Sequence, residues 1–206
     1  MNTLKITNYK EVKKLTILFM FTYMVSYITR INYGAIISEM EQATSFSKSM
    51  LSMALTGSFI TYGAGQIISG ICGDKFSPKK LVSMGLCATV LMNLLIPLCN
   101  NPYQMTAVWC ANGFAQAFMW PPIVKLMTTL LTEEDYKKTT VTISFGSSFG
   151  TIAVYLLSPL VISALSIRWV FFFSAAQIPR AIPMGILMIM EYRLTKMVGG
   201  SLDRKI

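Results

Sequence analysis

The sequence contains no histidine and little charge, and these two absences exclude several classes of protein. Charged residues make up 13% of the chain, whereas a soluble domain would carry about twice that share. Without histidine there is no zinc-protease helix motif, no Ser/His/Asp triad and no histidine proton shuttle. No acidic pair lies inside an apolar stretch and no phosphate-cradling loop occurs. We therefore expect neither an enzyme nor a cofactor.

The cysteines are few and are not spaced as metal ligands. Cys72, Cys87, Cys99 and Cys110 lie in or at the edges of apolar stretches. Such cysteines behave as small hydrophobic residues. We expect no metal site.

Long uncharged runs make up most of the remaining sequence. Residues 49–73, 81–124 and 139–167 carry no charge, and each run can hold at least one spanning helix of ~20 residues. The middle run must hold two, divided at the prolines and amides of residues 97–102.

With one helix before these runs and one after them, the prediction is an all-α membrane protein with six transmembrane helices. A basic arm (1–14) precedes the bundle (15–190), and a charged tail (191–206) follows it. The spans are expected near residues 15–38, 48–72, 81–98, 103–126, 139–164 and 169–190.

The net charge of +9 is distributed unevenly between the two ends of the predicted helices. One side carries Lys48 and Arg168. The other carries Lys5, Lys10, Lys13, Lys14, Lys75, Lys79, Lys80, Lys125, Lys137, Lys138, Arg193, Lys196, Arg204 and Lys205. By the positive-inside rule both termini are cytoplasmic in a multi-pass protein of the cell membrane. The basic excess is thus a topology signal, and no nucleic-acid partner is expected. No cleavable signal peptide is evident, because the first apolar run is too long for one.

An arginine inside the first predicted helix needs an explanation. A guanidinium near the bilayer centre costs at least ~2.5 to 3.5 kcal/mol on insertion scales. At 100° per residue, one polar face of this helix carries Tyr23, Ser26, Tyr27, Arg30 and Tyr33. One interpretation is an anion site in a water-filled cavity. The other is a structural arginine that meets helix-end carbonyls or snorkels to the surface.

The second predicted helix begins with Ser45 or Ser47 as its N-cap and has two kinds of face. Tyr62, Gln66 and Ser69 share a polar face that can line the same cavity as Arg30. Small residues let helices approach closely in lipid. We therefore assign to helix packing the residues Gly57, Gly63, Gly65 and Gly70.

That helix ends in the stretch Gly70-Ile71-Cys72-Gly73-Asp74-Lys75-Phe76-Ser77-Pro78-Lys79-Lys80. The stretch resembles the loop between helices 2 and 3 of the major facilitator superfamily, although Lys75 replaces the commoner arginine. The resemblance implies a loop that takes part in a conformational latch. Its residues would be Gly70, Asp74, Lys75, Lys79 and Lys80.

Two further stretches resemble one branch of that superfamily, the organophosphate:phosphate antiporters. They are Tyr27-Ile28-Thr29-Arg30-Ile31-Asn32-Tyr33 and Asn112-Gly113-Phe114-Ala115-Gln116-Ala117-Phe118-Met119-Trp120-Pro121-Pro122. We read the last three residues as a helix kink and assign them no substrate contact. The resemblance implies alternating-access transport of an organic phosphate or other small anion, in exchange for phosphate or protons. The implied substrate-binding residues are Arg30, Tyr27, Tyr62 and Gln66, although Gln66 stands where a lysine is expected.

The last two predicted helices leave alternatives open. Ser144, Ser148, Thr151 and Tyr155 form one stripe, opposite the pair Gly146 and Gly150. The stripe either lines a cavity or bonds back to its own helix. Arg180 stands between Pro179 and Pro183, which each free a carbonyl one turn earlier. It is either a structural arginine or part of a polar pathway.

Members of the resembled superfamily have twelve helices in two halves, each half built of 3+3 inverted repeats. This chain matches the amino-terminal half, and the charged tail lies where the linker between halves begins. The resemblance implies that a second arginine comes from the other half. A complementary half or a homodimer is thus an expected partner, besides the lipid bilayer. The alternative is a protein that does not transport: a truncated fragment, or a membrane partner or sensor.

Overall fold

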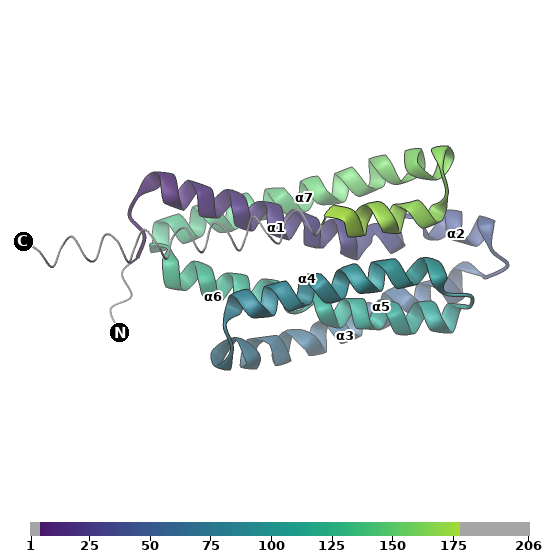
Figure 1. The fold of residues 1–206 in the computed structure, drawn as a ribbon, viewed down its shortest axis with the longest axis horizontal. Coiled ribbons are helices and arrows are strands. Elements are labelled where there is room, and N and C mark those ends of the chain that lie inside the picture. The colour runs from purple at the N-terminus through teal and green to yellow at the C-terminus, as the bar shows by residue number, and fades with distance from the viewer. Residues whose placement is uncertain (1–4, 178–206) are drawn as a thin grey trace, which may run out of the picture.

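The structure, a computed structural model, describes residues 5–177, and every regular element in them is a helix (Figure 1). A last helix begins at Ile167 and reaches the end of the described part at Gln177. The expectation of an all-α fold is confirmed for these residues. The other elements are α1 (Tyr9–Ala35), α2 (Ile37–Ala43), α3 (Lys48–Lys75), α4 (Pro78–Leu95), the 3-10 helix η1 (Ile96–Leu98), α5 (Pro102–Gln116), α6 (Trp120–Leu130) and α7 (Glu133–Ala164).

Several helices begin at a polar side chain that accepts a free backbone N–H of the first turn. Of the two serines expected to cap α3, Ser47 does so, and its Oγ accepts from the N–H of Met50 at 3.4 Å. Asn101 and Thr132 cap α5 and α7 in the same way. Each cap satisfies a donor that has no partner inside the helix.

The segment expected as one helix over residues 103–126 is two helices. α5 ends at Gln116 and α6 begins at Trp120, with Pro121 and Pro122 in its first turn. Proline has no N–H to offer and its fixed φ suits the first turn of a helix. The Trp-Pro-Pro stretch is therefore the start of a new helix.

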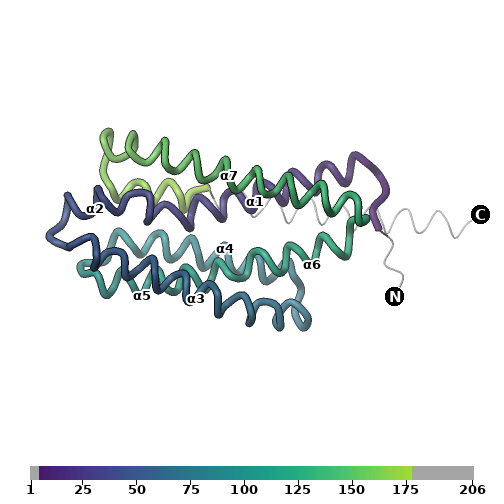
Figure 2. The backbone as a smooth tube through the Cα atoms, turned by 180° about the vertical axis from the view of Figure 1, so that it is seen from behind, coloured from purple at the N-terminus to yellow at the C-terminus, as the bar shows by residue number. Residues whose placement is uncertain are grey.

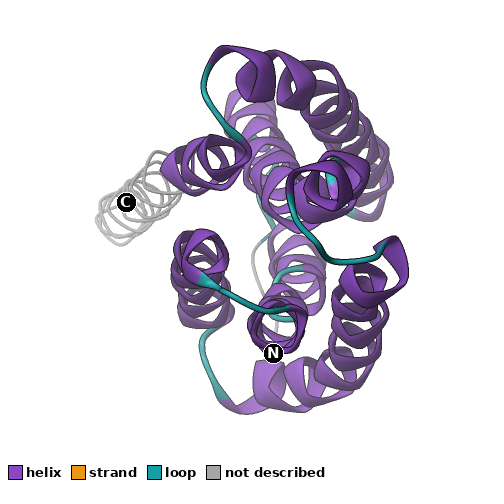
Figure 3. Ribbon diagram, turned by 90° about the vertical axis from the view of Figure 1, so that its right-hand side faces the viewer, coloured by secondary structure: helices purple, strands orange, loops and turns teal. Residues whose placement is uncertain are grey.

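The helices pack in pairs along a bundle whose members run nearly parallel (Figures 2 and 3). α1 lies along α7, and α3 lies along α5. α4 packs against α5, and the shorter α6 contacts both α3 and α4. The two long pairs are thus joined mainly through α4 and α5.

Glycines allow the close approach of α3 to α5. A Cβ added at Gly65 would lie 2.7 Å from the Cβ of Ala117, and one added at Gly57 would collide with a cysteine sulfur of α5. The packing assignment is confirmed for these two glycines. Within the described residues it does not hold for Gly63 and Gly70, where an added Cβ meets nothing within 4 Å.

Glycines also allow the close approach of α7 to α1. A Cβ added at Gly146 would lie 2.8 Å from the carbonyl oxygen of Met20, and one at Gly150 would lie 2.8 Å from that of Met24. Both glycines are buried. The predicted packing face of this helix is therefore confirmed.

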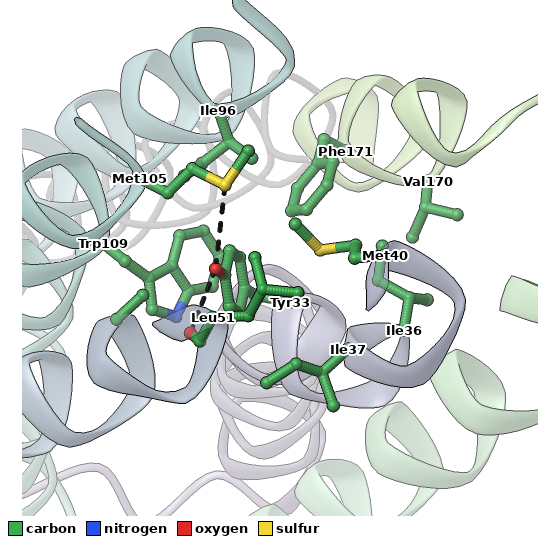
Figure 4. Close-up of a cluster of buried hydrophobic side chains, with 11 residues drawn as sticks. Tyr33, Ile36, Ile37, Met40, Leu51, Ile96, Met105, Trp109, Val170 and Phe171 are labelled. Carbon is green, nitrogen blue, oxygen red and sulfur yellow. Dashed lines mark hydrogen bonds between the residues drawn. The ribbon is translucent and has the colours of Figure 1, made fainter. Parts of the chain in front are cut away.

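An apolar cluster fills the end of the bundle that contains α2 (Figure 4). At its centre Tyr33 is fully buried, with its ring centroid 5.0 Å from that of Trp109 and 6.3 Å from that of Phe171. The Tyr33 hydroxyl donates to the carbonyl of Leu51 at 3.2 Å. The assignment of Tyr33 to the polar face of the first helix is therefore wrong, because its ring packs inside the core.

The outer faces of several helices are apolar. Ile67 of α3 is 71% exposed and Leu156 of α7 is 66% exposed. Large exposed apolar surfaces mark contact with lipid or with another protein. By length and composition, the helical stretches in the described part that are able to cross a membrane are Pro78–Leu98 and Glu133–Ala164.

Candidate substrate site

Arg30 of α1 lies against two tyrosine rings that come from different helices. Its guanidinium carbon is 4.3 Å from the ring centroid of Tyr62 on α3 and 5.1 Å from that of Tyr27 on α1. All three side chains are half-buried. Such cation–π contacts are worth about 0.5–2 kcal/mol, depending on how far the pair is removed from water.

No carboxylate within residues 5–177 forms an ion pair with Arg30. Its guanidinium carbon lies over two aromatic rings, and the N–H donors of a guanidinium point in the plane of the group. A planar fork of donors matches the oxygens of a carboxylate or phosphate. The arrangement is therefore chemically suited to an anion.

An aromatic row continues from Arg30 towards the start of α6. The ring centroids of Tyr27 and Tyr23 are 5.1 Å apart, and those of Tyr23 and Trp120 are 5.0 Å apart. Tyr23 was expected on this face, whereas Trp120 was not assigned to it. The sequence did offer one signal for Trp120, because it lies in the stretch from Asn112 to Pro122 that resembles the antiporters.

Gln66 lies one turn beyond Tyr62 on the same face of α3 and is half-buried. It makes no hydrogen bond to Arg30 or to either tyrosine. The structure thus brings Tyr27 and Tyr62 onto Arg30 and places Gln66 beside them.

A buried polar network lies behind the site, between α1 and α5. The Gln116 side chain accepts from Ser26 Oγ at 2.5 Å and donates to Ser26 O at 3.2 Å and Thr29 Oγ1 at 3.1 Å. These three residues are almost fully buried. The polar face predicted for the first helix therefore divides: Ser26 packs inwards against α5, whereas Arg30 faces the tyrosines.

Asparagines extend this network to α4. The Thr29 carbonyl accepts from Asn93 Nδ2 at 3.1 Å and from Asn112 Nδ2 at 3.3 Å. Asn32 Nδ2 donates to Asn93 Oδ1 at 2.7 Å. Asn93 was missed by the sequence reasoning, although an amide inside a long uncharged run is a visible signal.

The loop after α3 is tied to α6 by one lysine. Lys125 Nζ lies 2.8 Å from Asp74 Oδ1 and donates to the carbonyl of Gly73 at 2.6 Å. The hydrogen bond from Lys125, and then its charge, lower the pKa of the Asp74 carboxyl. Lys125, a side chain of α6, thus caps a free carbonyl in the last turn of α3.

The other predicted loop residues lie on the two helices that flank this contact. Gly70 is exposed on α3, and Lys75 is exposed in its last turn. Lys79 and Lys80 lie in the first turn of α4. Lys125 was not assigned to the loop by sequence, because it is distant in the chain.

The hydroxyl stripe of α7 bonds to its own helix. Ser144 donates to Thr140 O at 3.1 Å, Ser148 to Ser144 O at 3.1 Å and Thr151 to Ser147 O at 2.9 Å. Back-bonding is therefore confirmed for these three residues, and the cavity-lining interpretation of the stripe stays a prediction. Arg180 lies outside the described residues.

The fold and the site together define a helical membrane protein with a cationic site between its helices. The chain belongs to the Major Facilitator Superfamily, whose family model matches residues 19–179.

Relatives narrow the resemblance further. The chain is 29% identical over 108 residues to a probable hexose phosphate transport protein of Chlamydia muridarum, covering 52% of this chain and 24% of the relative. It is 28% identical over 106 residues to the membrane sensor protein UhpC of Escherichia coli, with 52% and 24% covered. It is 30% identical over 93 residues to sugar phosphate exchanger 3 of Bos taurus, with 42% and 18% covered. The predicted family and branch resemblance is confirmed, and so is the expectation of a non-enzyme, since these relatives are transport, exchange and sensor proteins.

A solved structure shows the same fold at low sequence identity. A crystal structure of the peptide transporter POT (E310Q mutant) in complex with sulfate matches with a TM-score of 0.66 and 11% identity. The match covers 98% of this chain and 47% of that transporter. The chain therefore spans about half the length of the solved transporter, and its matches to the curated relatives cover about a quarter of theirs.

Proposed function

We propose that the chain forms the amino-terminal half of a secondary transporter that binds an organic phosphate and moves it by alternating access. The observation that carries the proposal is Arg30, a half-buried guanidinium that lies over two tyrosine rings and has no carboxylate partner in the described structure. Relatives named for hexose phosphate transport and sugar phosphate exchange support the class of substrate. Tyr27, Tyr62 and Gln66 line the site beside Arg30.

In this proposal the six transmembrane segments are α1, α3, α4 with η1, α5 with α6, α7 and the helix from Ile167. The packing pairs support a 3+3 inverted repeat. The first segment packs along the fifth, and the second along the fourth. An inverted repeat exchanges the first segment with the fourth, the second with the fifth and the third with the sixth. This exchange converts the pair of the first and fifth segments into the pair of the fourth and second. The basic residues then place both termini in the cytoplasm of the cell.

A second six-helix unit completes the site in this proposal. A phosphate monoester carries a charge of about −1.5 to −2 at neutral pH. Arg30 compensates one charge, so a further cation has to come from outside the described residues. Further residues of the same polypeptide, a complementary chain or a second copy are the possible sources. The contact of Lys125 with Asp74 forms part of the latch between conformations.

The test is exchange of labelled phosphate in liposomes that contain the purified chain, alone and with a complementary half. Exchange is expected with the wild type and is expected to be lost in Arg30→Lys, because an ammonium offers no planar fork. Arg168→Lys is the matched control, since Arg168 is an exposed arginine in the first turn of the last described helix and has no contact with Tyr27 or Tyr62. Wild-type exchange that survives Arg30→Ala would refute the role of Arg30.

The second candidate is a sensor that binds a phosphorylated ligand and does not transport it. The similarity to the membrane sensor protein UhpC favours it. Both candidates use Arg30 as the anion ligand. Phosphate that protects the chain against thermal unfolding, with no exchange by either assembly, would identify the sensor.

A further inference from the structure

Side-chain amides from two other helices hold α1 at Thr29, the residue before Arg30. Asn93 of α4 and Asn112 of α5 donate to the Thr29 carbonyl at 3.1 and 3.3 Å. Gln116 of α5 donates to the Thr29 hydroxyl at 3.1 Å. None of these four residues is more than 1% exposed. We call Asn93, Asn112 and Gln116 the amide clamp.

Side-chain bonds continue along α1 beyond Thr29. The N–H of Tyr33 donates to Asn32 Oδ1 at 2.9 Å, and Asn32 Nδ2 donates to Asn93 Oδ1 at 2.7 Å. The segment from Thr29 to Tyr33, which contains Arg30, is thus bonded to side chains as well as to its own helix.

The clamp is not an efficient way to stabilise a helix bundle. Asn112 Oδ1 and the nearby Thr89 Oγ1 on α4 are buried and have no hydrogen-bond partner among residues 5–177. An unpartnered buried polar atom costs about 1–3 kcal/mol. A partly satisfied polar network is less stable than well-packed apolar side chains. The presence of these amides is therefore better explained by their effect on the position of α1 than by a gain in stability.

We propose that Asn93, Asn112 and Gln116 are positioning residues of the anion site, which fix the rotation of α1 and so hold the Arg30 guanidinium over the Tyr62 ring. The inference rests on the proposed function for its ligand, but not for its geometry. Leucine at a clamp position releases Thr29. α1 can then turn about its axis, and Arg30 leaves the ring of Tyr62.

A second buried polar contact on α1 provides the matched control. Thr16 and Thr139 join α1 to α7 through a hydroxyl–hydroxyl bond of 2.8 Å, and Thr139 is 1% exposed. Thr16 lies about 21 Å along the helix from Arg30 at 1.5 Å per residue. Thr139→Val therefore removes a buried bond from the same helix without touching the site.

The experiment uses the full chain in lipid nanodiscs, with isotope-labelled arginine and inorganic phosphate as the probe. The side-chain protons of Arg30, assigned by their loss in Arg30→Lys, should be shifted upfield by the Tyr62 ring. Asn93→Leu, Asn112→Leu and Gln116→Leu are compared with Thr139→Val, and thermal unfolding identifies the variants that fold. Asn112→Ser, which is too short to reach Thr29, replaces any leucine variant that does not fold.

The expected result is loss of the upfield shift and a roughly tenfold weaker phosphate affinity in the clamp variants, with both retained in Thr139→Val. Loss of the shift in the clamp variants of a chain that binds no phosphate, either alone or with a complementary half, upholds the positioning and refutes the proposed function. Folded clamp variants that keep both the shift and the affinity overturn the inference. Equal changes in Thr139→Val also overturn it, because they indicate general loosening.

Discussion

At the scale of single residues, the site depends on which side of α1 each polar side chain faces. Helical periodicity placed Ser26, Tyr27, Arg30 and Tyr33 on one face. The structure separates them into a tyrosine-lined site, an inward contact with Gln116 and a core ring. Arg30 and Tyr27 share a surface, while Tyr33 helps to fill the apolar cluster.

The ring of Tyr62, more than its hydroxyl, is expected to support the anion site. Tyr62→Leu should weaken phosphate binding by the chain about two- to thirtyfold, the equivalent of one cation–π contact of about 0.5–2 kcal/mol. Tyr62→Phe keeps the ring and should retain most of the affinity. Calorimetric titration with phosphate measures both. Tyr103→Leu, an exposed tyrosine of α5, is the control, and equal losses in the leucine and phenylalanine variants would exclude the ring contact.

Acid is expected to release the contact between Asp74 and Lys125. The pKa of the Asp74 carboxyl is lowered in the folded state, so its contribution to stability is present above the ordinary carboxyl pKa. That contribution is lost as the pH falls through the lowered value. The unfolding temperatures of wild type and Asp74→Asn should differ near neutral pH and converge in strong acid. A difference that persists in strong acid would show that the ion pair is not its cause, and Glu39→Gln is the control.

At the scale of elements, the helix pairs are held by glycines that the sequence identified only in part. Composition alone assigned four of the five glycines of α3 to packing. Two of them pack against α5 and two face open space. Periodicity could not separate them, because the side of α3 that meets α5 depends on the position of α5.

One substitution at two positions on α3 should have opposite effects. Gly65→Ala places a Cβ 2.7 Å from Ala117 and should destabilise the chain by about 1–3 kcal/mol. Gly63→Ala meets open space and should be neutral, or stabilising by a few tenths of a kcal/mol through helix propensity. Thermal unfolding in detergent measures both. Equal destabilisation at the two positions would contradict the observed packing of α3 on α5.

At the scale of the whole molecule, charge and hydropathy patterns predicted the all-α class, and short motifs predicted the family. The kink expected at Trp120-Pro121-Pro122 is a full break between α5 and α6. Two features were not predictable: the partner of Asp74 and the clamp at Thr29. Each depends on contacts between residues distant in sequence, such as Lys125 with Asp74 or Asn93 with Thr29. Local sequence patterns do not show which distant residues will meet, even where a residue type such as a polar amide stands out in an apolar stretch.

The proposed orientation predicts opposite accessibility for the two ends of α3. Lys48 begins its first turn at the less basic end, and Lys75 lies in its last turn. In a cysteine-free background, Lys48→Cys should react with an impermeant maleimide added to intact cells. Lys75→Cys should react only after permeabilisation. The reverse pattern would place the termini outside the cell.

The contact of Lys125 with α3 also makes the end of that helix sensitive to ionic strength. Lys125 binds a largely exposed carboxylate and a backbone carbonyl at once. Dissolved salt screens the exposed ion pair, since the Debye length is about 8 Å at physiological ionic strength. The bond to the carbonyl has no opposite full charge to screen and weakens less. A rise in salt therefore loosens Asp74 first and leaves Lys125 on Gly73, so the surrounding electrolyte sets how firmly α3 and α6 are joined.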